Sequence, residues 1–570
     1  MQESATAGSV RAMTTRAGYV GRCEAERAAR LDDRAALAAV LLVVIFVGFV
    51  RFRVADVPLE RDEGEYAYTG QLILQGVPPY RLAYNMKFPG TYYAYAAILA
   101  VFGPTRWGIH VGLLFVNAAT ILLVFRLGRR LLGALPAAIA ATSFALLSID
   151  RWTLGVFAHA THFVLPPLMG GFLLLLRANE SRRALEYFAA GILLGTSVLM
   201  KQHAAFFLPL GVGLVVSDDL RAGRFDVRAT GKRLGLLVSG SALPLLILLA
   251  VLLAQGVLGR FWFWTFRYAA EYASEEPLRH AVPYLLDRLR VVTRATLLLW
   301  ITGGLGLVAL WVDRWPAATR GFLTAFFAAS FLSICPGFYF REHYFILLLP
   351  AVGLLGGVAA ASTDRLLGRI FPARVARALV LVLVAAAAAR YVVAERAFLF
   401  SMSARELSRL RYAGNPFVEA VEIARYLGER TEASERIAVL GSEPEIYFYA
   451  DRRSATGYMY TYPLMESQPY ARTMQEEMIQ EIESAHPTYL VFVGIGLSWL
   501  PRPGSDPTIL QWASRYTQAC YRLVGIADIH APDSTKYAWE DGGMGYRLAS
   551  QELIYTFRRT SDAPCAVGHR

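Results

Sequence analysis

The chain has 570 residues, of which 55% are hydrophobic and 18% carry a formal charge, whereas an ordinary soluble domain carries about 25% charged residues. This composition excludes a purely soluble protein, because lipid must be the solvent for much of the chain. The net charge of +12 does not indicate nucleic-acid binding. The arginines lie in short clusters between apolar runs and form no basic stripe interleaved with aromatic residues.

Eleven apolar runs are long enough to be candidate membrane spans. They are Ala35–Phe52, Trp107–Phe125, Leu135–Ile149, Phe157–Leu176, Leu185–Met200, Ala204–Ser217, Leu234–Leu258, Thr296–Val312, Gly321–Pro336, Tyr344–Ser362 and Val375–Ala394. The stretch Thr91–Gly103 is short for a span, so we predict an interfacial helix there. Because one further pair of crossings stays open, we expect a polytopic α-helical membrane protein with about 11–13 transmembrane helices.

Every second connection between these spans is rich in arginine, which indicates the cytoplasmic side. Residues 1–34 are polar and basic and lack the apolar core of a cleaved signal, so we predict a cytoplasmic tail. Residues 35–394 then form the transmembrane domain, with outer loops at Arg53–Arg106 and Gly259–Arg294. An odd number of spans places residues 395–570 outside the cytoplasm. We therefore expect a multi-pass protein of the inner (plasma) membrane.

The C-terminal segment has the pattern of a soluble α/β domain. Helix-like Phe417–Arg430 and Thr473–Ser484 alternate with strand-like Arg436–Leu440, Ile446–Tyr449, Tyr489–Val493 and Ile554–Arg558. Cys520 and Cys565 both lie here, where an oxidising compartment permits a disulfide. The sequence leaves open whether these two cysteines pair.

The first outer loop is unusually acidic. Its carboxylates are Asp56, Glu60, Asp62, Glu63 and Glu65, all just beyond the first span. They are explained either as a solvated loop that caps a helix beginning near Glu63 or as part of a reaction centre. Lys87 follows in the same loop. A carboxylate and a cation fixed at a lipid interface can accept a proton from a hydroxyl and neutralise a lipid phosphate, which supports the second explanation.

The pattern Arg61-Asp62-Glu63-Gly64-Glu65-Tyr66-Ala67, followed by Lys87-Phe88-Pro89-Gly90 and Tyr92-Tyr93, resembles the first outer loop of family 39-type GT-C glycosyltransferases. That group includes protein O-mannosyltransferases and lipid A aminoarabinose transferases. Leu199-Met200-Lys201-Gln202 and Arg341-Glu342-His343-Tyr344-Phe345 are similar to later motifs of the family. The resemblance covers about Ala35 to Ala394, with a looser likeness at Val439–Tyr462, and Phe88 departs from the usual motif.

The resemblance implies that a monosaccharide passes, with inversion, from a polyprenyl-phosphate carrier to a hydroxyl on the outer face. The acceptor would be an envelope lipid, a glycan or a protein, and membrane lipid would surround the enzyme. By position, Asp62 and Glu63 take the catalytic role and Lys87 the role of the cation near the donor phosphate. His343, Tyr344 and Lys201 match the donor site less closely.

Several residues outside the first loop are candidates on physical grounds. Lys201 and Arg341 each interrupt an apolar region at the predicted outer edge, where a cation either snorkels or binds something. Arg267 lies in the aromatic run Phe261–Tyr268, which forms either an interfacial belt or a sugar-stacking surface with a further phosphate donor.

The sequence predicts no metal ligands. His159 and His162 lie three residues apart, but no carboxylate lies beside them. No cofactor is indicated, and a divalent metal stays open.

Two other classes of protein compete with the enzyme. A transporter or flippase of lipid-linked sugars would carry ionisable residues near mid-membrane and two halves of like hydropathy. A receptor that uses its tail as a binding module would leave the acidic loop unexplained. Convergence of Asp62, Lys87 and Arg341 on one outward cavity would favour the enzyme.

Overall fold

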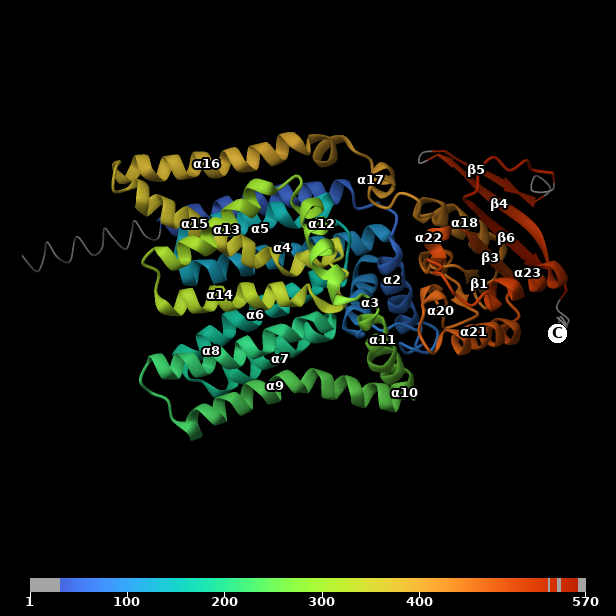
Figure 1. Cartoon of the computed structure of the whole chain (residues 1–570), viewed down its shortest axis with the longest axis horizontal. Helices are drawn as coiled ribbons and strands as arrows, with labels where there is room; N and C mark the ends of the chain where they lie inside the picture. The colour runs from blue at the N-terminus through green and yellow to red at the C-terminus, as the bar shows by residue number, and fades with distance from the viewer. Residues whose placement is uncertain (1–30, 532–533, 541–544, 562–570) are drawn as a thin grey trace, which may run out of the picture.

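The computed structural model describes residues 31–531, 534–540 and 545–561, so residues 1–30 of the predicted tail and Cys565 lie outside it. It has two parts (Figure 1). Long helices form a bundle, and an α/β domain covers one end of this bundle. The predicted fold class, a helical membrane protein with a C-terminal α/β domain, is confirmed.

Each of the eleven predicted spans coincides with a helix. These are the helix Leu31–Arg53, α4 (Arg106–Leu132), α5 (Ala134–Ser148), α6 (Ala160–Ser181), α7 (Ala184–Met200), α8 (Leu208–Arg221), α9 (Val227–Ala254), α13 (Leu297–Val312), α14 (Ala317–Ser333), α15 (Leu349–Leu367) and α16 (Ala373–Ala394). By length and composition, six of the described helices can cross a membrane, or seven if the bent pair Leu278–Thr293 and Leu297–Val312 is one span. The other predicted spans are helices of 15 to 19 residues. The chain is a multi-pass helical membrane protein.

Glycines allow α7 and α9 to pack with their backbones in contact. A Cβ atom added at Gly195 of α7 would lie 2.1 Å from the carbonyl oxygen of Ser241 in α9. Gly191 lies one turn earlier on the same face, and a Cβ atom added there would lie 2.2 Å from the carbonyl oxygen of Leu237. Small residues four apart are a common means of close helix packing in lipid, where apolar burial gives no driving force.

Short helices from the two outer loops lie between the bundle and the C-terminal domain (Figure 1). The first loop contributes α2 (Arg61–Leu74) and α3 (Gly90–Phe102), which confirms a helix where Thr91–Gly103 predicts one. The second loop contributes α10 (Leu258–Trp262), α11 (Ala269–Ser274) and α12 (Ala281–Thr293).

The C-terminal domain has one mixed six-stranded sheet in the order β2-β1-β3-β6-β4-β5. The strands are β1 (Arg436–Leu440), β2 (Arg453–Ser454), β3 (Tyr489–Gly494), β4 (Tyr521–Ala531), β5 (Ser534–Trp539) and β6 (Leu553–Arg559). Its helices are α17 (Ala404–Arg411), α18 (Phe417–Arg430), α19 (Glu445–Ala450), α20 (Tyr462–Met465), α21 (Ala471–Ala485), α22 (Gly496–Trp499) and α23 (Thr508–Cys520). Strand β1 is parallel to β2 and β3, and the remaining pairs are antiparallel.

One predicted strand is wrong. The run Ile446–Tyr449 belongs to helix α19, which begins directly after Pro444. A short, fully apolar run does not distinguish a buried strand from a buried helix by its periodicity. All but one residue of this helix are buried, so the run carries no exposed face that would have revealed a helical repeat.

The α/β domain shares a hydrophobic core with the loop helices. Tyr66 and Leu72 of α2 belong to the same buried cluster as Ile437 and Val491 of the sheet. At Gly64 the approach of α2 to α19 is so close that a Cβ atom would lie 2.7 Å from the backbone nitrogen of Glu445. The domain is therefore packed onto the first outer loop as part of one structural unit.

Candidate active site

A capping box fixes the start of α2 and with it the position of Asp62. The Glu60 carboxylate accepts a hydrogen bond from the Glu63 backbone N–H at 3.0 Å, and the Glu63 carboxylate accepts one from the Glu60 N–H at 3.1 Å. Asp62 lies in the first turn between them, and its side chain remains 25% exposed. The acidic loop therefore caps a helix and also presents one carboxylate that faces away from the cap.

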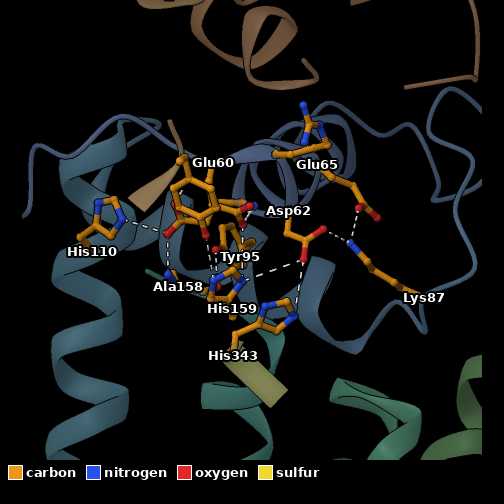
Figure 2. Close-up of polar contacts among 12 residues, drawn as sticks. Glu60, Asp62, Glu65, Lys87, Tyr95, His110, Ala158, His159 and His343 are labelled. Carbon is orange, nitrogen blue, oxygen red and sulfur yellow. Dashed lines mark hydrogen bonds and ion pairs between the residues drawn. The ribbon is translucent and has the colours of Figure 1, made fainter. Parts of the chain in front are cut away.

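Lys87 is held between two carboxylates (Figure 2). Its Nζ donates to Asp62 Oδ1 at 2.7 Å and to Glu65 Oε2 at 2.6 Å, and it lies 4.6 Å from the centre of the Tyr66 ring. Burial alone would raise the pKa of Asp62, but the Lys87 ammonium holds that pKa well below its usual value. Asp62 is therefore ionised. Two of the three ammonium donors of Lys87 are already used within the protein.

Two imidazoles lie on the other side of Asp62 (Figure 2). His159 Nδ1 and His343 Nε2 are each 3.9 Å from Asp62 Oδ2, and the two rings stack with their centres 4.1 Å apart. Glu60 Oε1 is 3.5 Å from the same His159 nitrogen. Burial lowers the pKa of His159 to about 4, so its ring is neutral at physiological pH. One oxygen of Asp62 thus faces Lys87, and the other faces two neutral imidazoles.

Lys201 and Arg341 are cations that form no ion pair with any carboxylate in the part of the chain that the structure describes. The Lys201 Nζ lies over the Tyr344 ring at 4.3 Å from its centre. The Arg341 guanidinium donates a long hydrogen bond of 3.4 Å to the Tyr272 hydroxyl. Burial, together with the charges of Lys87 and Arg341, lowers the pKa of Lys201 to about 7.

These groups line a single cavity of about 380 Å³ between the bundle and the C-terminal domain. Asp62, Lys87, Lys201, Arg341, His343 and Tyr344 all contribute to its wall. Aromatic side chains of the loops and of the C-terminal domain line much of the remainder, namely Tyr84, Trp264, Tyr268, Tyr272, Tyr458, Tyr460 and Tyr462. The structure thus brings six of the eight predicted site residues together.

Glu63 and Arg267 do not line this cavity. Glu63 is fully buried behind it, where His110 Nε2 lies 2.9 Å from its carboxylate and the Ala158 backbone N–H donates to the same oxygen. This contact fixes the turn that carries His159. Arg267 is exposed on a π-helical turn, Phe263–Tyr268, whose buried residues Trp264 and Tyr268 reach the cavity in its place.

The C-terminal domain contributes residues that the sequence did not identify. The Tyr460 hydroxyl donates to the Arg61 carbonyl at 2.9 Å and lies 3.3 Å from Asp62 Oδ1. Glu466 also lines the cavity, accepts a hydrogen bond from Tyr268 at 2.6 Å and has its pKa raised by burial to about 7. Only the looser likeness around Val439–Tyr462 pointed to this region, and it singled out no side chain.

A sequence profile of the family described as dolichyl-phosphate-mannose-protein mannosyltransferase matches residues 86–255. No curated protein sequence matches the chain. Solved structures match nearly all of it. ArnT from Cupriavidus metallidurans in the apo state is 16% identical with a TM-score of 0.57, over 92% of this chain and 98% of that one.

The same ArnT bound to undecaprenyl phosphate is 14% identical with a TM-score of 0.54, over 91% of this chain and 97% of that one. The archaeal oligosaccharyltransferase AglB from Archaeoglobus fulgidus, in complex with an inhibitory peptide and a dolichol-phosphate, is 12% identical with a TM-score of 0.51, over 90% of this chain and 75% of that one. The chain has the GT-C glycosyltransferase fold. This confirms the resemblance seen in the first outer loop.

Within this GT-C fold, the match to the family profile includes Lys87, His159 and Lys201 but begins after Asp62. The first-loop carboxylate and the C-terminal tyrosines are therefore placed at the cavity by this structure alone.

Proposed function

We propose that this GT-C protein transfers a monosaccharide from a polyprenyl-phosphate-linked donor to a hydroxyl of an envelope lipid, glycan or protein. The observation that carries the proposal is the arrangement of one ionised carboxylate, Asp62, and two unpaired cations, Lys201 and Arg341, around one cavity. The ArnT and AglB structures that share the fold contain undecaprenyl phosphate and dolichol-phosphate respectively, which supports a lipid phosphate as the donor group.

Lys201 and Arg341 are the residues best suited to bind the donor phosphate. A phosphate requires donors that converge from different elements, and these two come from the end of α7 and from the loop before α15. Lys87 has one ammonium donor left for the same anion, since Asp62 and Glu65 take the other two. Its main contribution is to fix Asp62.

The reaction proposed is a single displacement at the anomeric carbon. The acceptor oxygen forms a bond to that carbon while the bond from carbon to phosphate oxygen breaks, and the phosphate leaves with the electron pair. Lys201 and Arg341 stabilise the charge that develops on it. A carboxylate with a lowered pKa is a weak base, so Asp62 orients the acceptor hydroxyl and takes its proton late, when the new bond has made that hydroxyl acidic.

The donor set Asp62, His159 and His343 suits a divalent cation. One atom from each of these residues lies within 4.8 Å of the others, and His159 Nδ1 is buried without a hydrogen-bond partner. Two imidazoles and a carboxylate are ligands that zinc and similar metals accept. The sequence does not predict His159 as a metal ligand, because no carboxylate lies beside it in the chain. In the folded structure, Asp62 lies beside it. We infer that these three residues hold a metal that would supply additional positive charge beside the donor.

We expect metal bound to the purified protein to fall when these ligands are removed. His159→Ala and His343→Ala should each lower the metal content measured by inductively coupled plasma mass spectrometry, because each removes one of three ligands. His203→Ala is the matched control, since this partly buried histidine hydrogen-bonds to the Ser333 carbonyl and is not part of the cluster. Equal metal content in all variants would show that the cluster does not hold a metal.

We infer that the cavity and the C-terminal domain face the outside of the inner (plasma) membrane. The clusters of arginine between alternate spans support this orientation. A phosphatase fused after Arg570 should be active, whereas a reporter that folds only in the cytoplasm should be silent at that point. The reverse result would mean that the number of crossings is even.

The donor-binding step should depend on the ionisation of Lys201. Because burial lowers the pKa of Lys201 to about 7, the free enzyme loses this charge as the pH rises through 7, and kcat/KM for the donor should fall above that pH. Bound phosphate stabilises the ammonium, so kcat should fall at higher pH than kcat/KM. Lys201→Arg should remove this decline, since arginine stays protonated.

A pH profile of initial rates checks this result. If the decline persists in Lys201→Arg but disappears in Glu466→Gln, the titrating group is Glu466, and Lys201 is not the ionising donor ligand.

A flippase is less consistent with the structure than a transferase, because Asp62, Lys87 and Arg341 converge on one cavity at one end of the bundle. Mass spectrometry of envelope glycolipids and glycoproteins distinguishes the two. Cells that lack the protein should lose one sugar-modified species, and the wild-type gene should restore it. Loss of the same species with lipid-linked sugar retained on the inner face would instead indicate transport, whereas loss of a transferase leaves the unused donor on the outer face.

A further inference from the structure

Helix α16 touches the bundle at its two ends and leaves a groove between them. Near its start, Val380 packs against Ile139 of α5 and Ala360 of α15. Near its end, Tyr391 is buried in the main core. Between these contacts lies a cavity of about 920 Å³, bounded by α5, α13, α15 and α16. We call this cavity the α16 groove.

The α16 groove is shorter than a full membrane crossing. Its wall runs from Val380 to Arg390 on α16, about 15 Å along the helix, and from Leu298 to Asp313 along α13, about 22 Å, whereas a hydrocarbon core is about 30 Å thick. Apolar side chains such as Leu298, Leu305 and Leu383 line most of it. This shape fits acyl chains better than a transmembrane helix, which would cross the full thickness.

The end of the groove near the α15 terminus is polar and positively charged. Ser362, Thr363, Arg365 and Arg369 converge there with Asp313. Asp313 is already paired with Arg365, at 2.7 Å, and Arg365 lies 4.2 Å from the centre of the Trp315 ring. Arg369 forms no ion pair within residues 31–531, 534–540 and 545–561. The single acid is therefore neutralised, and one positive charge is left over for a ligand.

We propose that an anionic glycerophospholipid occupies the α16 groove, with its phosphate at Arg369, Arg365 and Thr363 and its acyl chains between α13 and α16. We place the phosphate at this end of the groove because Arg365 and Arg369 both line it, whereas a single arginine, Arg390, lines the other end. Arginine clusters at this edge are those predicted to be cytoplasmic, where anionic lipids gather. The site is separate from the proposed sugar transfer and does not depend on it.

The bound lipid would stabilise the attachment of the C-terminal domain. Helix α16 continues through a π-helical turn, Ala397–Ser401, into α17 of the C-terminal domain, and only three of its 22 residues are buried by protein. A lipid that fills the groove fixes α16 against α13 and α15, and so acts as a structural ligand.

Native mass spectrometry of the full chain, released from vesicles of equal phosphatidylglycerol and phosphatidylcholine content, tests the proposal. Wild-type protein should retain phosphatidylglycerol in preference to phosphatidylcholine. Arg369→Gln should reduce that preference about five-fold, the change expected for one basic residue at an anionic surface. Arg228→Gln, an exposed arginine at the start of α9, should leave it unchanged.

A second variant probes the apolar part of the groove. Ala386→Phe places a ring where the acyl chains lie, so it should reduce retention of both lipids while the protein remains folded by circular dichroism. Equal retention of the two lipids by wild type, or a preference that Arg369→Gln does not alter, would overturn the proposal. It would equally be overturned if Ala386→Phe converted a dimer to a monomer, because a second copy would then occupy the groove.

Discussion

Asp62→Asn should lower the rate of sugar transfer by about 10²–10⁴-fold, the range that a positioned proton acceptor contributes. Asparagine keeps the size of the side chain and can still accept from Lys87, but it cannot take a proton from the acceptor hydroxyl. The protein should insert and be recovered in detergent at the wild-type yield. Initial rates with a synthetic polyprenyl-phosphate sugar measure the effect.

Asp56→Asn is the matched control. Asp56 lies in the same loop and pairs with Arg106 at 2.7 Å, but its side chain is 64% exposed and does not line the cavity. Glu60 and Glu65 are unsuitable controls, because the first caps α2 and the second anchors Lys87. Wild-type transfer by Asp62→Asn, or an equal loss in Asp56→Asn, would remove Asp62 from the reaction.

Lys87→Ala should destabilise the protein as well as inactivate it. Its removal leaves Glu65, whose side chain is fully buried, without its cation. Losing one member of a buried pair typically costs about 3–5 kcal/mol. Transfer should also fall sharply, since Asp62 would lose the contact that fixes its orientation. Thermal unfolding in detergent and initial rates measure the two effects separately.

The double variant Lys87→Met with Glu65→Gln separates these two roles of Lys87. It removes the unpaired buried charge, so most of the stability should return, whereas transfer should remain low because Asp62 still lacks its partner. Lys87→Arg keeps the charge and should retain more activity than either variant. Recovery of transfer in the double variant would show that Lys87 acts only through stability.

The apolar runs predicted the helices well because burial in lipid requires a long apolar stretch, and such a stretch is read directly from the chain. Helix boundaries were less well predicted. The run Tyr344–Ser362 corresponds to α15 at Leu349–Leu367, because its first residues belong to a 3-10 helix, Glu342–Leu347, which places His343 beside Asp62. Local backbone geometry of this kind leaves no periodic pattern in the amino-acid sequence.

The site was predicted where its residues are close in sequence. Asp62 and Lys87 share one loop, so their pattern was visible before folding. The sequence does not predict His159 as a ligand or Tyr460 as a site residue, because each meets Asp62 only through the packing of separate elements. The charge of Arg267 predicts a phosphate ligand, whereas the π-helical turn presents Trp264 and Tyr268 to the cavity.

The close approach at Gly64 also has a consequence for protein engineering. The loop helices and the sheet share a core although most of the bundle separates them in the chain. Exchanging the C-terminal domain alone with that of another GT-C protein would therefore join mismatched halves of one interior. A functional chimaera would have to carry residues 53–106 together with residues 395–570 as a discontinuous exchange unit.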